Sequence, residues 1–218
     1  EIQARLRERY PDQDPPSLTS IYNVLERAGL IPSRRTRRRV HPGAAVVDGI
    51  KAPNGLWSAD FKGQFLMGDA RWCYPLTVMD HASRYVLGCH GLTSTRGVPA
   101  RAVFERLFRE YGVPERIRTD NGVPFASMGT GGLSRLSVWW IRLGIVPERI
   151  TPGRPQQNGR HERMHRTLKE ATTRPVASHL PAQQAAFDAF RHDYNYDRPH
   201  EALGQQPPAS AYTPSPRA

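Results

Sequence analysis

Residues 56–90 read LWSADFKGQFLMGDARWCYPLTVMDHASRYVLGCH, and this stretch decides the fold class. Three short segments within it, 56–61, 73–79 and 84–90, are rich in aromatic, β-branched and other apolar residues, which is typical of β-strands. The last two segments flank residues 80–83 (DHAS), whose composition indicates a turn. The stretch therefore predicts three strands joined by tight connections.

Helical and strand-like patterns alternate after this stretch. The expected elements are a helix over 97–111, a strand over 115–119, a helix over 133–143, a strand from 145 and a helix over 156–173. The order β-β-β-α-β-α-β-α predicts an α/β domain in which helices flank a mixed sheet of five strands. A last helix is expected over 181–195, ahead of a proline-rich tail.

The N-terminal part carries two short helical patterns. Ser17 can cap the second helix, and apolar residues at 18, 21, 22 and 25 share one face before Gly29 ends it. This arrangement resembles the last two helices of a helix-turn-helix domain, with a generic helical hairpin as the alternative.

The whole chain is strongly basic. Its 218 residues include 31 Lys and Arg against 20 Asp and Glu, for a formal charge of +11, and only three of the bases are lysines. Arginine pairs with phosphate in a bidentate geometry, so this balance favours a nucleic-acid partner. A genome that prefers arginine codons is the alternative explanation of the excess.

One short stretch gathers five of the arginines: Arg34, Arg35, Arg37, Arg38 and Arg39. Like charges at this density repel one another and stay disordered unless an anion binds them. Because the stretch joins the helical N-terminal part to the main domain, we expect a linker that follows DNA phosphates, rather than a solvated tag.

Composition also excludes several classes of protein. No apolar run approaches the ~18 residues that a membrane span needs, and no signal peptide is visible. The two cysteines, Cys73 and Cys89, form no C-x-x-C pair, which argues against a thiolate zinc site and a disulfide framework. These features are typical of a protein of the reducing cytoplasm.

Three acidic residues stand out by their positions. Asp60 lies on the first expected strand, Asp120 directly follows the fourth, and Glu162 lies on the third expected helix. Taken singly, each has an ordinary explanation: a strand end, an Asp-Asn-Gly turn and a solvated helix residue. Adjacent strands and a helix packed at their ends would nevertheless bring the three carboxylates together.

Five motifs surround these acids: WSADF at 57–61, DHASR at 80–84, RTDNG at 118–122, PQQNGRHER at 155–163 and YNYDRPH at 194–200. They resemble the motifs of the integrase-like transposases of bacterial insertion sequences, which are relatives of the retroviral integrases. The resemblance covers about residues 51–213. It implies a ribonuclease H-like fold and a catalytic Asp-Asp-Glu triad, which falls on Asp60, Asp120 and Glu162.

On this resemblance the chain divides into four parts. We expect a partial helix-turn-helix over 1–33, a basic linker over 34–52, an integrase catalytic core over 53–175, and a C-terminal helix with a proline-rich tail over 176–218. The first part lacks the opening helix of a helix-turn-helix domain, so we expect the chain to be a fragment cut within that region.

The spacing of the acids departs from the family in one respect. The gap between Asp120 and Glu162 holds 41 residues, which is longer than the family's usual gap. We expect the surplus to be the glycine-rich stretch 127–132, as a surface loop where insertions cost little. Asp80, at another strand end, is outside the family's triad and is interpreted as structural.

The resemblance also implies the chemistry. Three neighbouring carboxylates repel one another, and two divalent cations, Mg²⁺ or Mn²⁺, would relieve that repulsion and clamp a phosphodiester. Family members first free a 3′ end of DNA with water and then join that end to target DNA. We therefore expect double-stranded DNA, both transposon ends and target, as the partner of a homo-oligomer, at least a dimer, in the bacterial cytoplasm and associated with the nucleoid.

The helix that carries Glu162 supplies further DNA-binding candidates. Arg166 and Lys169 lie four and seven residues after Glu162, which places them on the same helical face. Asn158, in the QNG motif, is a further candidate. A solvated basic face is the ordinary alternative for these residues.

Two histidines on the same helix leave alternatives open. His161 and His165 are expected to hydrogen-bond phosphate or to face solvent, while an apolar stripe at 164, 168 and 171 packs on the core. The same residues match H-E-x-x-H, in which two histidines and a glutamate would make a zinc protease site. The arginines around the motif disfavour that interpretation. A non-catalytic nucleic-acid-binding protein that keeps only the fold is a further alternative.

Overall fold

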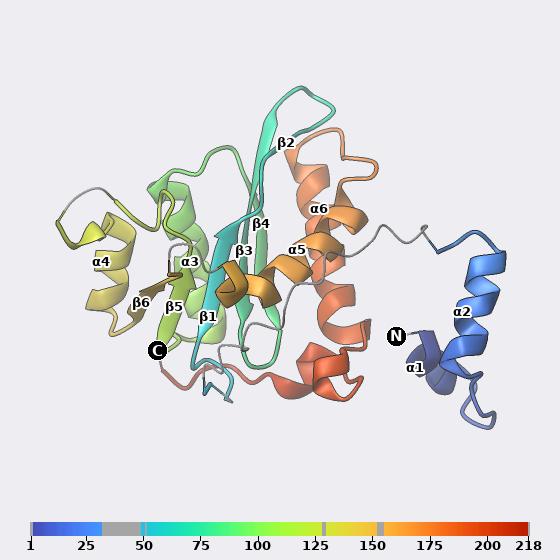
Figure 1. Cartoon of the computed structure of the whole chain (residues 1–218). Helices are drawn as coiled ribbons and strands as arrows, with labels where there is room; N and C mark the ends of the chain where they lie inside the picture. Colours follow the sequence, from blue (N-terminus) through green and yellow to red (C-terminus); the bar gives the residue numbers. More distant parts are fainter. Residues whose placement is uncertain (1, 32–48, 51, 128–129, 152–154, 218) are drawn as a thin grey trace.

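The strand β1 (Trp57–Phe61) lies within a mixed sheet of six strands (Figure 1). The computed structural model describes residues 2–31, 49–50, 52–127, 130–151 and 155–217. The other strands are β2 (Phe65–Leu66), β3 (Trp72–Asp80), β4 (Val86–Leu92), β5 (Arg116–Thr119) and β6 (Val146–Arg149). They follow the order β2-β3-β1-β5-β6, and β4 pairs with β3. β1 is antiparallel to β3 and parallel to β5, so the predicted mixed sheet is confirmed.

The sheet has one strand more than the five that the sequence predicted. The additional strand is β2, which has two residues and pairs with the start of β3 at Phe65↔Cys73 and Leu66↔Trp72. Two residues are too few to show the alternation with a period of two that identifies a strand in a sequence. The short strand forms only because the chain after β1 returns alongside β3.

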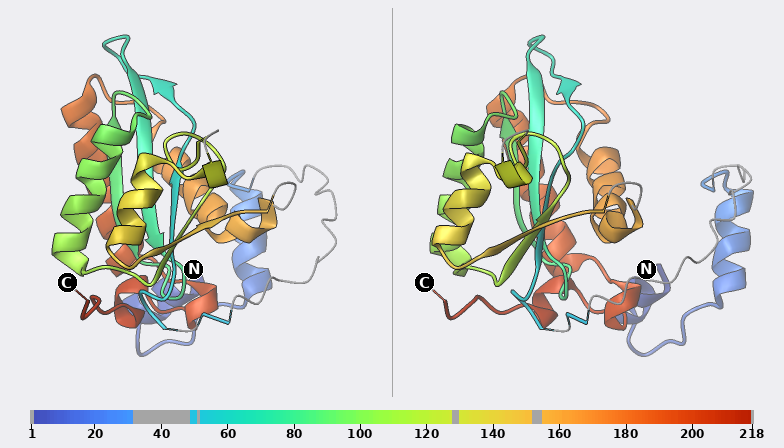
Figure 2. Two further views of the ribbon diagram at one scale, coloured as in Figure 1. Left: turned by 90° about the vertical axis from the view of Figure 1, so that its left-hand side faces the viewer. Right: turned by 60° about the vertical axis from the view of Figure 1, so that its left-hand side comes forward.

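Helices cover both faces of the sheet (Figure 2). One face carries α3 (Gly97–Tyr111) and α4 (Arg135–Arg142), and the other carries α5 (Gly159–Thr172) and α6 (Leu180–His192). Successive strand residues point to opposite faces, and Val78 and Met79 of β3 accordingly enter different cores. The core under α3 and α4 includes Trp57, Leu76, Val78, Phe104, Leu107 and Trp140. The core under α5 and α6 includes Cys73, Met79, Val86, Met164, Leu168 and Phe187.

The boundaries of α4 have local causes. Ser134 caps its start, since its hydroxyl accepts from the Ser137 backbone N–H at 3.1 Å and the Ser137 hydroxyl accepts in return from the Ser134 N–H. Gly144 ends the helix at a φ of 71°, in the left-handed region that favours glycine. Ala126 and Leu133, which flank the stretch 127–132, form an isolated β-bridge. The capped helix α4 begins at Arg135, so this stretch does not disrupt the helix that follows it.

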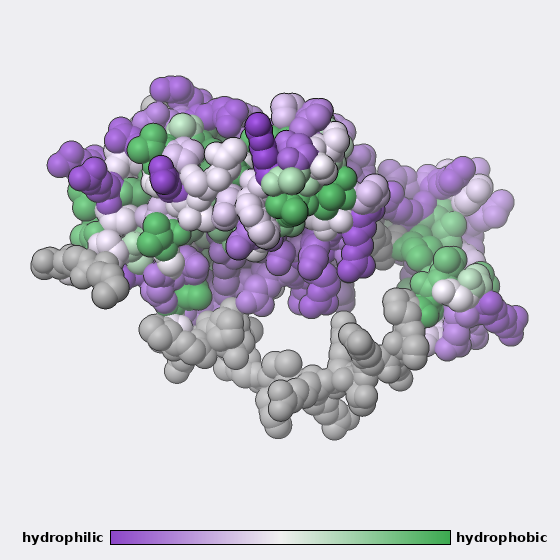
Figure 3. All heavy atoms as spheres, turned by 90° about the horizontal axis from the view of Figure 1, so that it is seen from above, coloured by the Kyte–Doolittle hydropathy of each residue, from purple (hydrophilic) through white to green (hydrophobic). Residues whose placement is uncertain are grey.

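The N-terminal part forms two helices, α1 (Ile2–Arg9) and α2 (Leu18–Arg27). Ser17 caps α2 as expected, because its hydroxyl accepts from the Ser20 backbone N–H at 3.1 Å. Neither helix buries any residue in the part of the chain that the structure describes. Leu18 and Val24 are exposed, and Figure 3 shows apolar residues on the surface of this part. The helix-turn-helix interpretation and the domain boundaries stay predictions.

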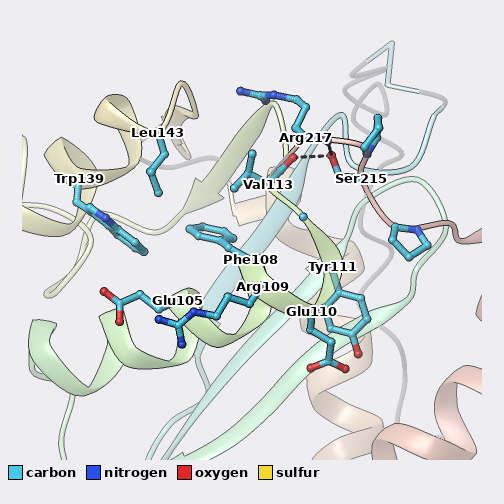
Figure 4. Close-up of a pocket in the computed structure, with 13 residues that line it drawn as sticks. Glu105, Phe108, Arg109, Glu110, Tyr111, Val113, Trp139, Leu143, Ser215 and Arg217 are labelled. Atoms are coloured by element: carbon cyan, nitrogen blue, oxygen red, sulfur yellow. Dashed lines mark hydrogen bonds between the residues drawn. The ribbon is translucent and has the colours of Figure 1, made fainter.

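The C-terminal segment is hydrogen-bonded to β4 and to the chain just after α3. After α6 comes a short π-helical turn, η3 (Asp193–Asp197), in which the Asn195 side chain bonds both the backbone N–H and the carbonyl of Val86, at 2.8 and 2.9 Å. The tail then runs to the end of α3 and lines a pocket of about 560 Å³ with α3 and α4 (Figure 4). None of the described helices is both long and apolar enough to cross a membrane.

Candidate active site

The pairing of two parallel strands places the first two acids side by side. Ser58 of β1 pairs with Arg118 of β5. β5 ends at Thr119, so Asp120 directly follows the strand that lies beside β1, about 4.8 Å away, and the charge of Asp120 acts on Asp60. The third acid, Glu162, lies in the first turn of α5.

The electrostatics of Asp60 show that the three acids interact. Burial raises the pKa of Asp60 to about 7, and repulsion from Asp120 and, less strongly, from Glu162 acts in the same direction. Lys62 lowers the pKa of Asp60, but by less than Asp120 raises it. Asp60 and Asp120 are half-buried and Glu162 is exposed, so all three carboxylates are accessible beside α5.

Buried polar contacts fasten α5 to the strands under it. His161 is fully buried, and its Nδ1 lies 2.8 Å from the Ser58 hydroxyl of β1. Its Nε2 lies 2.7 Å from the Thr77 hydroxyl of β3, and the Nε2 of His165 lies 2.6 Å from the same hydroxyl. Thr77 also donates to the backbone carbonyl of Asp60 at 3.1 Å. One hydroxyl therefore joins the Asp60 strand to the Glu162 helix.

The proton positions follow from this network. The Thr77 hydroxyl carries one proton, which the Asp60 carbonyl can only accept, so both histidines donate to Thr77 through Nε2–H. Burial keeps them neutral, because it lowers the pKa of His161 to about 3 and that of His165 to about 2. The unprotonated Nδ1 of His165 then faces Asp60 Oδ2 at 3.7 Å.

The expectation that both histidines contact phosphate or solvent was wrong. His161, Met164, His165, Leu168 and Thr172 make up the buried side of α5. Their spacing of three and four residues is the signal that marks a helix face, and the structure places residue 172 rather than 171 at the end of the stripe. Ala171 is exposed, so its predicted place in the core was also wrong.

The zinc protease interpretation of H-E-x-x-H does not fit this geometry. Both ring nitrogens of His161 lie within hydrogen-bond distance of hydroxyls, at 2.7 and 2.8 Å. That leaves His161 without a ring nitrogen for zinc. Glu162 lies on the exposed side of α5, away from the two rings.

The Asp-Asn-Gly turn has a specific role for each residue. The Gly122 backbone N–H donates to Asp120 Oδ1 at 3.1 Å, which orients the carboxylate. A side chain at position 122 would bring its Cβ within 3.0 Å of Asp120 Oδ2. The Asn121 amide donates to the carbonyl of Ile150 at 3.0 Å, just after β6. The turn that the sequence predicts therefore also orients the carboxylate of Asp120.

An ion pair that the sequence analysis missed supports the start of α5. The guanidinium of Arg118, on β5, donates to Glu148 Oε2 on β6 from Nε at 3.1 Å and from Nη2 at 2.9 Å. Its Nη1 donates to the carbonyl of Gln157, in the turn η2 (Pro155–Asn158), at 3.3 Å. Strand pairing brings these residues together, and no local pattern indicates it.

The predicted DNA-binding residues differ in their surroundings. Arg166 and Lys169 are exposed on the same side of α5 as Glu162, where DNA can reach them. Asn158 is buried, with 7% of its surface exposed, at the start of α5. The arginines predicted as the linker lie outside the described residues: Arg34, Arg35, Arg37, Arg38 and Arg39. All remain predictions as DNA contacts.

Asp80 is structural, as interpreted. Its Oδ1 accepts from the Ser83 backbone N–H at 2.7 Å and from the Ser83 hydroxyl at 2.6 Å. Its Oδ2 accepts from the Asn54 backbone N–H at 2.8 Å. These bonds close the turn between β3 and β4 and fix the chain that enters β1.

The donor set at the site suits a divalent cation that shares its ligands with a substrate. Among the described residues, no three His, Cys, Asp or Glu side chains lie close enough to hold a metal ion by themselves. Mg²⁺ binds through few protein carboxylates together with water and phosphate oxygens. Burial and the charge of Asp120 raise the pKa of Asp60, and a bound cation would oppose both effects, so the three acids fit such an ion.

The raised pKa of Asp60 predicts that Asp60→Asn stabilises the metal-free protein. A carboxyl with a folded pKa of about 7, above its ordinary 3.8, contributes stability at low pH that is lost as the pH rises through 7. In EDTA at pH 8 we expect the Tm of the variant to exceed that of the wild type by at least about 3 °C.

The pH dependence supplies the control for this experiment. At pH 4, close to the ordinary pKa of 3.8, Asp60 is protonated in the folded protein and about half protonated in the unfolded chain, so the Tm difference is expected to be much smaller than at pH 8. Asp12→Asn, on the exposed N-terminal turn, is the matched variant and is expected to leave the Tm unchanged at both pH values. Equal Tm values for the wild type and Asp60→Asn at pH 8 would contradict the electrostatic account of the site.

Comparison with known sequences identifies the family. Two sequence models, both described as integrase core domain, match residues 50–155 and 143–208. The chain belongs to the integrase core domain family. The first match contains Asp60 and Asp120, and the second contains Glu162.

Relatives of this integrase core occur in bacterial insertion elements. It is 30% identical over 196 residues to the IS407 uncharacterized 31.7 kDa protein of Burkholderia multivorans, a match that covers 87% of this chain and 66% of the relative. It is 30% identical over 198 residues to the IS476 uncharacterized 39.2 kDa protein of Xanthomonas euvesicatoria, covering 87% of this chain and 53% of the relative. The chain thus spans between half and two thirds of these proteins.

Solved structures confirm the ribonuclease H-like fold. The integrase core matches the catalytic core domain of HTLV-2 integrase, solved in complex with magnesium, with a TM-score of 0.57 and 14% identity over 73% of this chain and 97% of that one. A chain of the simian T-cell lymphotropic virus intasome matches with a TM-score of 0.65 and 16% identity, over 99% of this chain and 76% of that one.

Proposed function

We propose that this integrase core is the catalytic part of a transposase that cleaves 3′ ends of DNA and transfers them to target DNA. The observation that carries the proposal is the raised pKa of Asp60, about 7, which burial, the charge of Asp120 and, least, the charge of Glu162 produce together. An uncompensated cluster of acids at the surface of a strongly basic chain suits a substrate that arrives with cations and carries phosphate.

Asp60, Asp120 and Glu162 are the proposed ligands of two Mg²⁺ or Mn²⁺ ions. When bound, such ions activate the attacking oxygen and stabilise the leaving 3′ oxygen. Thr77, His161 and His165 act as positioning residues, because their contacts hold the Glu162 helix against the Asp60 strand. The neutral rings fill the space under α5 and exclude water from it.

The exposed cations beside Glu162 would orient the DNA. Arg166 and Lys169 lie along the same side of α5 and can bind phosphates next to the scissile bond. Asn158 and the arginines at 34–39 are further proposed contacts, to both transposon ends and target DNA. Joining two ends requires at least two active sites, so we propose that the chain works as a homo-oligomer in the bacterial cytoplasm, on the nucleoid.

A nicking assay on supercoiled plasmid tests this function without knowledge of the terminal sequences. Nicking is expected in Mg²⁺ or Mn²⁺ and is expected to disappear in EDTA. DNA binding that weakens with salt, without nicking in either metal, would favour the non-catalytic DNA-binding alternative. The requirement for Glu162 decides whether any nicking comes from the proposed site.

A further inference from the structure

Helix α5 exposes two separate sides, of which the triad uses only one. Successive residues are about 100° apart around a helix, so Glu162, Arg166 and Lys169 follow one edge of its buried side. Arg160 and Arg163 lie beyond the opposite edge and are also exposed. Because a helix with its side chains is about 10–12 Å wide, these two arginines face a different region from the triad.

A third arginine approaches this second side from the sheet. Arg84 ends the turn between β3 and β4 with a φ of 67°, and its backbone N–H donates to the Asp80 carbonyl at 3.1 Å. Its Nη1 is buried and has no hydrogen-bond partner among the described residues. A buried guanidinium nitrogen without an acceptor is costly, which makes it a natural binding point for an anion.

The three arginines are close enough to repel one another. Burial lowers the pKa of Arg84 to about 10, and the charges of Arg160 and Arg163 lower it further in the same direction. Arg160 Nη1 donates to the His81 carbonyl at 2.8 Å, which fixes this side chain next to the turn. The charges of Arg198, Arg84 and Arg163 all lower the pKa of Tyr194, so Arg84 and Arg163 lie near the same hydroxyl.

The acid nearest to this group does not neutralise it. The carboxylate that acts on Arg84 belongs to Asp80, which already accepts the three hydrogen bonds that close the turn. This carboxylate is therefore already committed to the turn and does not cancel the charges of Arg160 and Arg163 that act on Arg84. Arg84 is half-buried, so an anion bound to it would be screened little by salt.

We propose that Arg84, Arg160 and Arg163 bind a phosphate of duplex DNA on the side of α5 that is turned away from the triad. This inference rests on the proposed function, because it takes DNA as the substrate. The phosphate would supply the acceptor that Arg84 Nη1 lacks and would offset the repulsion among the three guanidinium groups. DNA then contacts α5 along both sides, with one segment of backbone at the triad and a separate segment here.

Arg163→Gln tests the site, because its exposed side chain can be replaced without disturbing the core. The matched control is Arg142→Gln, which removes the same charge from the exposed end of α4, on the other face of the sheet. Binding of a fluorescein-labelled DNA duplex is measured by anisotropy, in EDTA, over a series of NaCl concentrations. Loss of one phosphate contact is expected to weaken binding about 5-fold at 0.15 M salt and to reduce the salt slope by about 1.

Arg84→Gln provides an independent variant. We expect the same loss of affinity and slope, while the Tm of the free protein stays equal or rises, since Nη1 loses no hydrogen bond and the repulsion is relieved. Equal affinities and slopes for Arg163→Gln and Arg142→Gln would overturn this inference, and metal-dependent nicking by the wild type would leave the proposed function standing. If the wild type bound no duplex, both proposals would fail.

Discussion

Glu162→Gln is expected to lower the rate of metal-dependent plasmid nicking by about 10²–10³-fold, the size of effect that follows loss of one electrostatic group from a catalytic site. Glutamine keeps the shape of the side chain and removes the charge that a divalent cation binds. Glu162 is exposed at the start of α5, so the change is expected to leave the fold intact. Initial rates of nicking in Mg²⁺ and Mn²⁺ measure the effect.

The same helix offers the control for this experiment. Glu170 is exposed two turns further along α5, and Glu170→Gln removes the same charge from the chain away from the triad. That variant is expected to nick at the wild-type rate. Glu162→Gln is also expected to bind DNA at least as tightly as the wild type, because it removes a negative charge that faces phosphate. Retention of nicking by Glu162→Gln would exclude the proposed active site.

Thr77→Val is expected to reduce the free energy of unfolding by about 3 kcal/mol. Valine has nearly the shape of threonine, but it removes a fully buried hydroxyl with three partners. The Nε2 atoms of His161 and His165 are left buried without a partner, and each such group costs about 1–3 kcal/mol. Urea unfolding with an unchanged m value measures the loss.

Two further variants separate the hydroxyl network from ordinary packing. Thr77→Ser keeps the hydroxyl and is expected to recover most of the stability. Thr172→Val removes another buried hydroxyl, on α5, which bonds only the Leu168 carbonyl one turn earlier at 2.8 Å, and is expected to cost less than about 1 kcal/mol. If Thr77→Val and Thr172→Val were equally stable, the network would not fasten α5. Nicking by folded Thr77→Val should also fall, whereas Thr172→Val should match the wild type.

Local patterns in the sequence predicted most of the elements. The helix predicted over 97–111 corresponds to α3 (Gly97–Tyr111). Gly144, which was expected to end the next helix, lies directly beyond α4 in a left-handed conformation. Ser17 caps α2 as its side chain and position suggested. Each of these features depends on neighbours within a turn or two, and such short-range physics is visible in a linear sequence.

The candidate site was predicted from motifs rather than from periodicity. Resemblance to the integrase-like transposases selected Asp60, Asp120 and Glu162, which lie within the matched ranges and whose catalytic roles stay predictions. The burial of His161 and His165 was not predicted, because the arginines around them in the sequence suggested an exposed helix. Arg118 and Glu148 were missed, because their pairing depends on the register between β5 and β6.

The sequence alone was enough to predict the order of the strands and helices apart from β2, the basic charge that suits a polyanion, and the three acids whose motifs carry the family resemblance. Folding brings Asp120 next to the Asp60 strand through the parallel pairing of β1 and β5, and it joins two buried histidines to that strand through Thr77. It also placed Arg84 beside Arg160 and Arg163. The physical reason is that helix spacing, caps and charge are local properties, whereas contacts between residues far apart in the chain exist only once the strands have found their register.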